Sequence, residues 1–78
     1  MAIDIAEIRR IVHESLEVPT DFEYDYDEEA DVLYVTFDRA IEDDATLTPN
    51  NLILRYCEGR LIGVTILNAS KRPNLHLP

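Results

Sequence analysis

The fold of this chain is decided by residues 26–70, a run that contains two hairpin signals and closes with GRLIGVTILNAS at residues 59–70. Within this run, residues 61–67 are apolar at most positions, which is typical of a strand with apolar side chains on both faces. Gly59 stands just before the strand and can adopt the positive φ that a tight hairpin connection requires. The segment therefore predicts the last strand of an antiparallel sheet, entered through a tight turn.

Three further strands are predicted upstream of this one. At residues 22–27 aromatic side chains alternate with carboxylates, which indicates a strand with one buried face and one solvated face. Residues 32–37 are mostly β-branched and aromatic, which favours a central strand. Residues 52–57 then supply the strand that precedes the Gly59 turn.

The segments between these strands have turn chemistry. Residues 27–31 are expected to form a hairpin loop, because Asp side chains bind the free amides of turns. Residues 46–48 are expected to be only a short edge extension, since a Pro-Asn-Asn turn follows directly at residues 49–51.

The N-terminal segment shows helical spacing. Ile5, Ile8 and Ile11 fall near one face, and charged side chains lie mostly on the other. Asp4 can cap the first turn, and a proline downstream prevents the helix from continuing. We expect one amphipathic helix at about residues 4–16.

Together these elements predict an α+β fold in which an N-terminal amphipathic helix packs on a four-stranded antiparallel β-meander. The chain is expected to be a single domain over residues 1–78, with the sheet at about residues 22–67 and a short C-terminal tail at residues 68–78. A core of this size buries only about 60% of the surface that the unfolded chain exposes, which favours self-association.

The chain is strongly acidic, with 16 Asp and Glu against 7 Lys and Arg and a formal net charge of -9. DNA or RNA would be repelled by this charge, which argues against direct nucleic-acid binding. Acidic residues gather in the first half of the chain, whereas Arg55, Arg60, Lys71 and Arg72 come later. We therefore expect poles of opposite charge.

The cellular compartment is indicated by what the chain lacks. A single cysteine, Cys57, cannot form an internal disulfide, which favours a reducing environment. No apolar run approaches the roughly 18 residues of a membrane span, and the N-terminus has no secretory pattern. We expect a cytoplasmic protein with no membrane association.

Both faces of the predicted sheet carry apolar side chains, and a single helix can cover only one of them. Monomers rarely expose large contiguous apolar patches, so we predict a homodimer built on the second face or on an edge strand. The candidate residues of this dimer surface are Val32, Tyr34, Leu61 and Leu67.

A resemblance is carried by a set of positions along the framework: Tyr26, Asp27, Ala30, Asp31, Leu33, Tyr34, Val35, Leu54, Tyr56, Gly59, Arg60, Leu61, Ile62, Gly63, Val64, Ile66, Leu67, Ala69 and Ser70. Over about residues 24–70 this pattern resembles the domain of unknown function 2283 family. The resemblance implies a small cytoplasmic protein with a compact antiparallel sheet and no established catalytic residues. Because some members lie near genes of toxin-like proteins, it also suggests an antitoxin or immunity role by analogy. The chain departs from the family pattern at Cys57, where Asp is common, and at Pro73, where relatives look more helical.

A metal site is not expected. The carboxylates at residues 25–31 alternate as calcium ligands do, but an EF-hand loop would need glycine and glutamate where this chain has Ala30 and Thr36. Solvated side chains of a hairpin explain the pattern better.

Catalysis and cofactor binding are not expected either. His13 and His76 each lie near a serine in the sequence, but no nucleophile motif accompanies them. Cys57 has Glu58 as its neighbour, and a carboxylate disfavours the reactive thiolate. We expect neither an enzyme nor a cofactor-binding protein.

These observations favour a non-catalytic protein-interaction module that forms a homodimer and uses an acidic surface to bind a basic partner, such as a toxin-like protein. The steering charges of this surface are Asp25, Asp27, Glu28, Glu29, Asp43 and Asp44. The alternative is a small-ligand or metal-binding domain whose site forms only between subunits.

Overall fold

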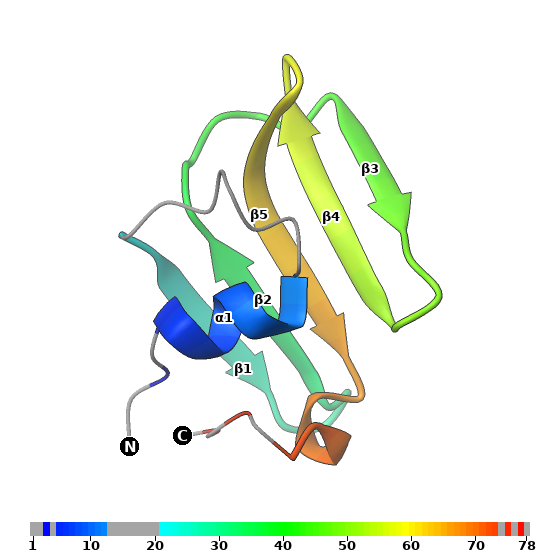
Figure 1. Ribbon diagram of the computed structural model, residues 1–78. Helices are drawn as coiled ribbons and strands as arrows, with labels where there is room; N and C mark the ends of the chain where they lie inside the picture. The colour runs from blue at the N-terminus through cyan, green and yellow to red at the C-terminus, as the bar shows by residue number, and fades with distance from the viewer. Residues whose placement is uncertain (1–2, 4, 13–20, 74, 76, 78) are drawn as a thin grey trace.

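The computed structural model describes residues 3, 5–12, 21–73, 75 and 77, and the described chain forms an α-helix, a β-sheet and a short 3-10 helix (Figure 1). In chain order the elements are α1 (Ile5–Val12), β1 (Glu23–Asp27), β2 (Val32–Thr36), β3 (Asp44–Leu47), β4 (Leu52–Cys57), β5 (Arg60–Leu67) and η1 (Ala69–Lys71). The predicted α+β class is confirmed. The predicted cap at Asp4 and the predicted helical residues after Val12 lie outside the described residues.

The sheet has five strands in the order β1-β2-β5-β4-β3, and all neighbouring strands are antiparallel. The predicted four-stranded meander is therefore wrong in two respects. The segment predicted as an edge extension forms β3, a full edge strand that pairs with β4 from Asp44 opposite Tyr56 to Leu47 opposite Ile53. In addition, β2 pairs with β5 and not with the next strand in the chain.

The meander is broken because the connector after β2 passes the ends of β5 and β4 before it reaches the far edge of the sheet. The amides of Phe37 and Asp38 both donate to the carbonyl of Ile62, at 2.8 and 3.1 Å. The amide of Asp43 then donates to the carbonyl of Tyr56 at 2.9 Å. These backbone bonds hold the connector across two strands, and they do not depend on a local sequence pattern.

The three hairpin connections turn where the sequence predicts. Asp31 ends the β1–β2 loop with a φ of 56°, and Asn51 ends the β3–β4 loop with a φ of 63°. Glu58 and Gly59 form the two-residue β4–β5 turn with φ values of 51° and 78°. Positive φ at both central residues is the conformation of a type I′ turn, which matches the twist of antiparallel strands.

Helix α1 covers one face of the sheet and forms the core with it (Figure 1). Alternate residues of the strands point into this layer, including Leu33 and Val35 of β2, while the helix contributes Ile8 and its neighbours. The buried residues of the core cluster are Ile3, Ile8, Ile11, Val12, Leu33, Val35, Leu52, Leu54, Leu61, Val64, Ile66, Ala69 and Leu75. No helix within the described ranges is long and apolar enough to cross a membrane.

A β-bulge interrupts the alternation of β5. Arg55 lies opposite Gly63, but the next residue, Tyr56, lies opposite Leu61, so Ile62 has no partner on β4. The side chain of Leu61 is 7% exposed and packs in the core cluster. An unbroken alternation would place Leu61 on the second face, as predicted for the dimer surface, but the bulge removes it from that face.

Candidate functional site

The face of the sheet opposite α1 is covered by no described helix or strand, and we call it the open face. The strand register places its side chains in three rows across the sheet. The rows are Glu23, Thr36, Gly63, Arg55 and Ala45; then Asp25, Tyr34, Thr65, Ile53 and Leu47; then Asp27, Val32 and Leu67. Each row begins on β1 with a carboxylate and continues with apolar or uncharged side chains, except at Arg55.

The apolar side chains of the open face remain accessible to solvent. Tyr34 is 41% exposed and Leu47 is 66% exposed, while Val32, Ile53 and Leu67 are half-buried. Three of the four predicted dimer residues thus lie together on this face, on the neighbouring strands β2 and β5.

Arg55 lies over Gly63 in the middle of the open face. Its Nη2 atom donates a hydrogen bond to the carbonyl oxygen of Val35 at 2.5 Å. A Cβ atom on Gly63 would lie 2.5 Å from the Arg55 Cζ atom and 2.8 Å from the same carbonyl oxygen, closer than real Cβ contacts come. Gly63 is therefore a site where a side chain approaches the backbone closely, which is a common reason for a glycine within a strand.

The guanidinium of Arg55 has no carboxylate partner among the described residues, unlike Arg39, which pairs with Glu23, and Arg60, which pairs with Asp38. Its Nε atom is buried and has no hydrogen-bond partner in the described chain. Arginine carries five N–H donors, and a buried donor without an acceptor costs about 1–3 kcal/mol. Arg55 is thus a half-buried cation of the open face that no described carboxylate neutralises.

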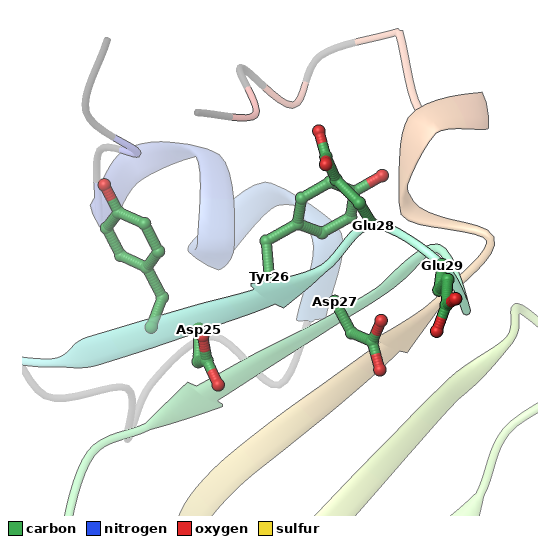
Figure 2. A pocket seen from close by; sticks show the side chains of 6 residues that line it. Asp25, Tyr26, Asp27, Glu28 and Glu29 are labelled. Carbon is green, nitrogen blue, oxygen red and sulfur yellow. The ribbon is translucent and has the colours of Figure 1, made fainter.

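Four carboxylates gather on β1 and the loop after it, and we call this group the acidic hairpin (Figure 2). Its members are Asp25, Asp27, Glu28 and Glu29, which line an open hollow together with Tyr24 and Tyr26. All four acidic side chains are exposed. The Oδ1 atom of Asp27 accepts a hydrogen bond from the amide of Ala30 at 3.2 Å, which confirms the predicted role of an aspartate in this turn.

The other two predicted steering residues lie elsewhere, at the start of β3 on the far edge of the sheet. The Oδ2 atom of Asp43 accepts a hydrogen bond from the amide of Glu58 at 2.9 Å. The Oδ1 atom of Asp44 accepts one from the amide of Ala45 at 2.9 Å. The predicted acidic surface is therefore divided into two groups, and the second group binds nearby backbone amides.

Within the part of the chain that the structure describes, the predicted poles of opposite charge are not separated, because basic side chains lie among acidic ones. Arg39 binds Glu23 at 2.6 Å, and Arg60 binds Asp38 at 2.5 Å. Hydrogen bonds from these guanidinium groups, with their charge, lower the pKa of both carboxyl groups. Lys71 lies in η1, which is hydrogen-bonded to the β1–β2 loop next to the acidic hairpin.

Asp31 connects the β1–β2 loop to η1. Its Oδ1 atom accepts hydrogen bonds from the hydroxyl of Tyr26 at 2.7 Å and the amide of Ser70 at 2.9 Å, and its Oδ2 atom accepts one from the hydroxyl of Ser70 at 2.7 Å. The amide of Ala69 also donates to the Asp31 carbonyl at 3.0 Å. The hydrogen bonds from Tyr26 and Ser70 lower the pKa of Asp31. The bond between Tyr26 and Asp31 also raises the pKa of the Tyr26 hydroxyl. Asp31 thus has a structural role.

Among the described residues, no group of three or more His, Cys, Asp or Glu side chains is placed to hold a metal ion. Cys57 is a half-buried free thiol on β4. Both histidines lie outside the described residues. A ligand or metal site formed between subunits stays a prediction.

The fold and its polar contacts define a small α+β domain in which many side-chain hydrogen bonds support turns and strand connections. The chain belongs to the family described as protein of unknown function (DUF2283), which matches residues 23–70. The match runs from the first residue of β1 to Ser70, so it includes the whole sheet and the hydrogen bonds of Asp31, but not α1. No curated protein and no solved structure matches the chain.

Sequence reasoning missed two features of this surface. The first is the position of Arg55, for which the available signal was an arginine within an apolar strand followed by a strand that contains a glycine. The second is the bond between Asp31 and Ser70, which are separated by 39 positions. No local pattern joins two residues so far apart.

Proposed function

We propose that this chain is a non-catalytic protein-interaction module that forms a homodimer through its open face and presents the acidic hairpin to a basic partner protein. One observation carries the proposal: the open face holds Tyr34 at 41% exposure and Leu47 at 66% exposure, and no described element covers it. Burial of apolar surface contributes about 25 cal/mol per Å². A second copy of the chain can bury this surface, because its own open face is equal in area.

The acidic hairpin supports the second half of the proposal. Asp27, Glu28 and Glu29 are exposed at one end of the sheet, where no described basic side chain forms an ion pair with them. Clustered charge of one sign accelerates encounter with a partner of the opposite sign. The family analogy gives the class of that partner, a small basic protein of the toxin-like kind.

Sedimentation equilibrium at micromolar concentration tests the dimer. The wild-type chain of 9.0 kDa should sediment as a dimer. Tyr34→Glu places a charge on the open face and should raise the dimer dissociation constant at least roughly tenfold, because it buries an unpaired carboxylate in the interface. The matched control is Tyr24→Glu, which changes the same residue type at 37% exposure on the face that carries α1. This control should leave the dissociation constant unchanged.

Thermal melts followed by circular dichroism establish that both variants fold. A wild-type chain that stays monomeric at about 100 μM would contradict the proposal, since that concentration exceeds the dissociation constants of ordinary specific dimers. Equal weakening by the two tyrosine variants would contradict it as well.

Affinity capture from the native host tests the basic partner. A small basic protein should be retained at low salt and released at high salt, because exposed charges are screened. The double variant Glu28→Gln with Glu29→Gln should lose this protein, whereas Asp43→Asn with Asp44→Asn should keep it. Loss of the protein in both variants, or in neither, would contradict a role for the acidic hairpin.

A further inference from the structure

We propose that the outer edge of β1 binds an extended segment of the basic partner protein as one more strand of the sheet, with basic side chains at every second position of that segment. This inference rests on the proposed function, from which it takes the basic partner of the acidic hairpin. It adds the backbone pairing that holds the partner and the sequence pattern that the edge selects.

The outer edge of β1 is open. The strand lies at one end of the strand order, and among the described segments it pairs with β2 alone. An edge strand points every second N–H and C=O group away from the sheet, and no backbone hydrogen bond joins these outer groups of β1 to another described segment. Such an edge is the surface to which an extended peptide adds as a strand.

The backbone of β1 is also regular along its length. The strand contains no proline between Glu23 and Asp27, all of which the structure describes. Its register with β2 runs from Glu23 opposite Thr36 to Asp27 opposite Val32 without a bulge. Prolines and bulges are common devices that keep an edge from pairing. The whole of β1 can therefore pair with an added strand.

A hollow follows this edge and is lined by six consecutive residues, 24–29 (Figure 2). Neighbouring residues of a strand point to opposite faces of the sheet. Tyr24 and Tyr26 accordingly lie on the side of α1, whereas Asp25 and Asp27 lie on the open face. A depression in either face would be lined by alternate residues, so a hollow that is lined by all of them lies along the edge, where an added strand would run.

The carboxylates of β1 argue against a second copy of the chain as the occupant of this edge. Glu23, Asp25 and Asp27 all lie on the same side of the strand. When two β1 strands pair antiparallel about a twofold axis, carboxylates of one copy therefore lie opposite carboxylates of the other. Like charges directly opposite each other destabilise a strand pair.

The same carboxylates fit a strand that carries basic side chains at every second position. Arg39 binds Glu23 at 2.6 Å, whereas Asp25 and Asp27 have no ion pair among the described residues. Directly opposite residues lie on the same side of a sheet, so basic side chains opposite these two aspartates form two cross-strand ion pairs.

The tyrosines of β1 define the other half of the pattern. The residues between the basic ones lie on the side of Tyr24, which is 37% exposed, and Tyr26, which is half-buried against the core. Apolar and aromatic side chains pair well with aromatic ones across strands. The edge thus selects a segment in which basic and apolar residues alternate.

The remaining acidic residues and the dimer are compatible with strand addition. Glu28 and Glu29 follow β1 and are exposed, so their charge attracts a basic segment before its backbone pairs. An added strand extends the sheet sideways. It therefore leaves the apolar side chains of the open face to a second copy.

Two synthetic peptides of equal composition test the pattern. One peptide alternates lysine with valine, and the other has the same residues with all lysines in one block. Fluorescence anisotropy measures the dissociation constant of each peptide with the wild-type chain. The alternating peptide should bind at least roughly tenfold more tightly, because only this peptide places lysines opposite both aspartates while its backbone pairs with β1. Equal affinities would overturn the inference.

N-methylation of the alternating peptide separates strand addition from attraction between charges alone. A methyl group removes an amide donor and leaves the charge of the peptide unchanged. In an added strand only every second amide faces β1. Methylation of the lysine amides and methylation of the valine amides should therefore differ, with a loss of roughly tenfold or more for one set and little loss for the other. Equal losses for both sets would contradict pairing of the backbone.

The double variant Asp25→Asn with Asp27→Asn tests the charges of the edge. It should weaken binding of the alternating peptide roughly threefold to tenfold, because two exposed cross-strand ion pairs are lost. Asparagine at position 27 still offers an oxygen to the amide of Ala30. The matched control, Asp43→Asn with Asp44→Asn, makes the same change of net charge at the far edge and should leave the dissociation constant unchanged. Equal weakening by the two double variants would overturn the assignment of the edge.

Competition separates this inference from the function on which it rests. A basic protein that is captured from the native host and displaced by the alternating peptide, but not by the block peptide, supports both. A captured basic protein that depends on Glu28 and Glu29 but is displaced equally by the two peptides overturns strand addition and leaves the proposed function standing. If no basic protein is captured, the partner in the proposed function is overturned, and the N-methylated peptides still decide whether the edge of β1 accepts a strand.

Discussion

The carboxylate of Asp31 receives both hydrogen-bond donors of Ser70, the amide at 2.9 Å and the hydroxyl at 2.7 Å, across 39 positions of the chain. Together with the Tyr26 hydroxyl, Ser70 binds the carboxylate in its ionised form. This contact joins the first hairpin to the segment that follows the last strand. It therefore connects the first hairpin to Ser70, the last residue of the region that matches the family.

The first prediction concerns this contact and its dependence on pH. Ser70→Ala should lower the melting temperature at pH 7, because Asp31 loses a charged hydrogen bond. The bonds from Tyr26 and Ser70 lower the pKa of Asp31 in the folded chain. Their stabilisation is therefore present above the unfolded pKa of about 3.9 and is lost as the pH falls through the lower folded value. Melts of wild type and Ser70→Ala should converge at low pH.

The control for this prediction is Asp31→Asn, which keeps a residue that tolerates the φ of 56° but removes the charge. When Ser70→Ala is added to this variant, the resulting change in melting temperature should be the same at pH 7 and at low pH. A difference in melting temperature between wild type and Ser70→Ala that stays constant over the whole pH range would show that ionised Asp31 does not support the contact.

The second prediction concerns Gly63 and Arg55. Gly63→Ala should destabilise the fold by about 1–3 kcal/mol, because the added methyl group overlaps a backbone carbonyl and a guanidinium. Urea denaturation measures the change. In an Arg55→Ala background the same substitution should cost less but should still destabilise, since the carbonyl oxygen of Val35 remains 2.8 Å away. Equal costs in the two backgrounds would mean that Arg55 does not lie over Gly63.

The third prediction concerns the two-residue turn between β4 and β5. Glu58 adopts a φ of 51°, a conformation that is costly for most residues. Glu58→Asn would give the Asn-Gly pair that type I′ turns prefer, and it should stabilise the fold by roughly 0.5–1 kcal/mol. Glu58→Ala should give no such gain, because alanine tolerates positive φ poorly. A gain of equal size from alanine would point to the loss of charge and not to the turn.

The sequence was informative wherever a property depends on neighbouring residues. The alternation in β1 and β2, the turn residues Asp31 and Asn51, and the Glu58-Gly59 turn were all identified at the correct positions. These features follow from side-chain periodicity and from backbone φ preferences, both of which are local. The presence of a second apolar face also followed from this periodicity.

The sequence was not informative where the structure depends on contacts between segments that are distant along the chain. The four exposed residues of β3 have no apolar pattern, so the strand exists because β4 offers it a hydrogen-bonding edge. The bulge opposite Arg55 and Tyr56 moves the side chain of Leu61 to the other face of the sheet, and no residue type in the sequence predicts this bulge. The acidic residues were predicted as one surface, but the crossing from β2 to β3 sends Asp43 and Asp44 to the opposite edge.

The central claim is that the open face is buried against a second copy of the chain. The most direct measurement is an isotope-filtered NMR experiment on a mixture of labelled and unlabelled chains, which detects only contacts between different copies. We predict cross-peaks between the ring protons of Tyr34 in one copy and methyl groups of the open face in the other, such as those of Leu67, because both side chains lie on the proposed dimer surface. A filtered spectrum without these cross-peaks, together with the tumbling time of a 9.0 kDa monomer, would contradict the claim.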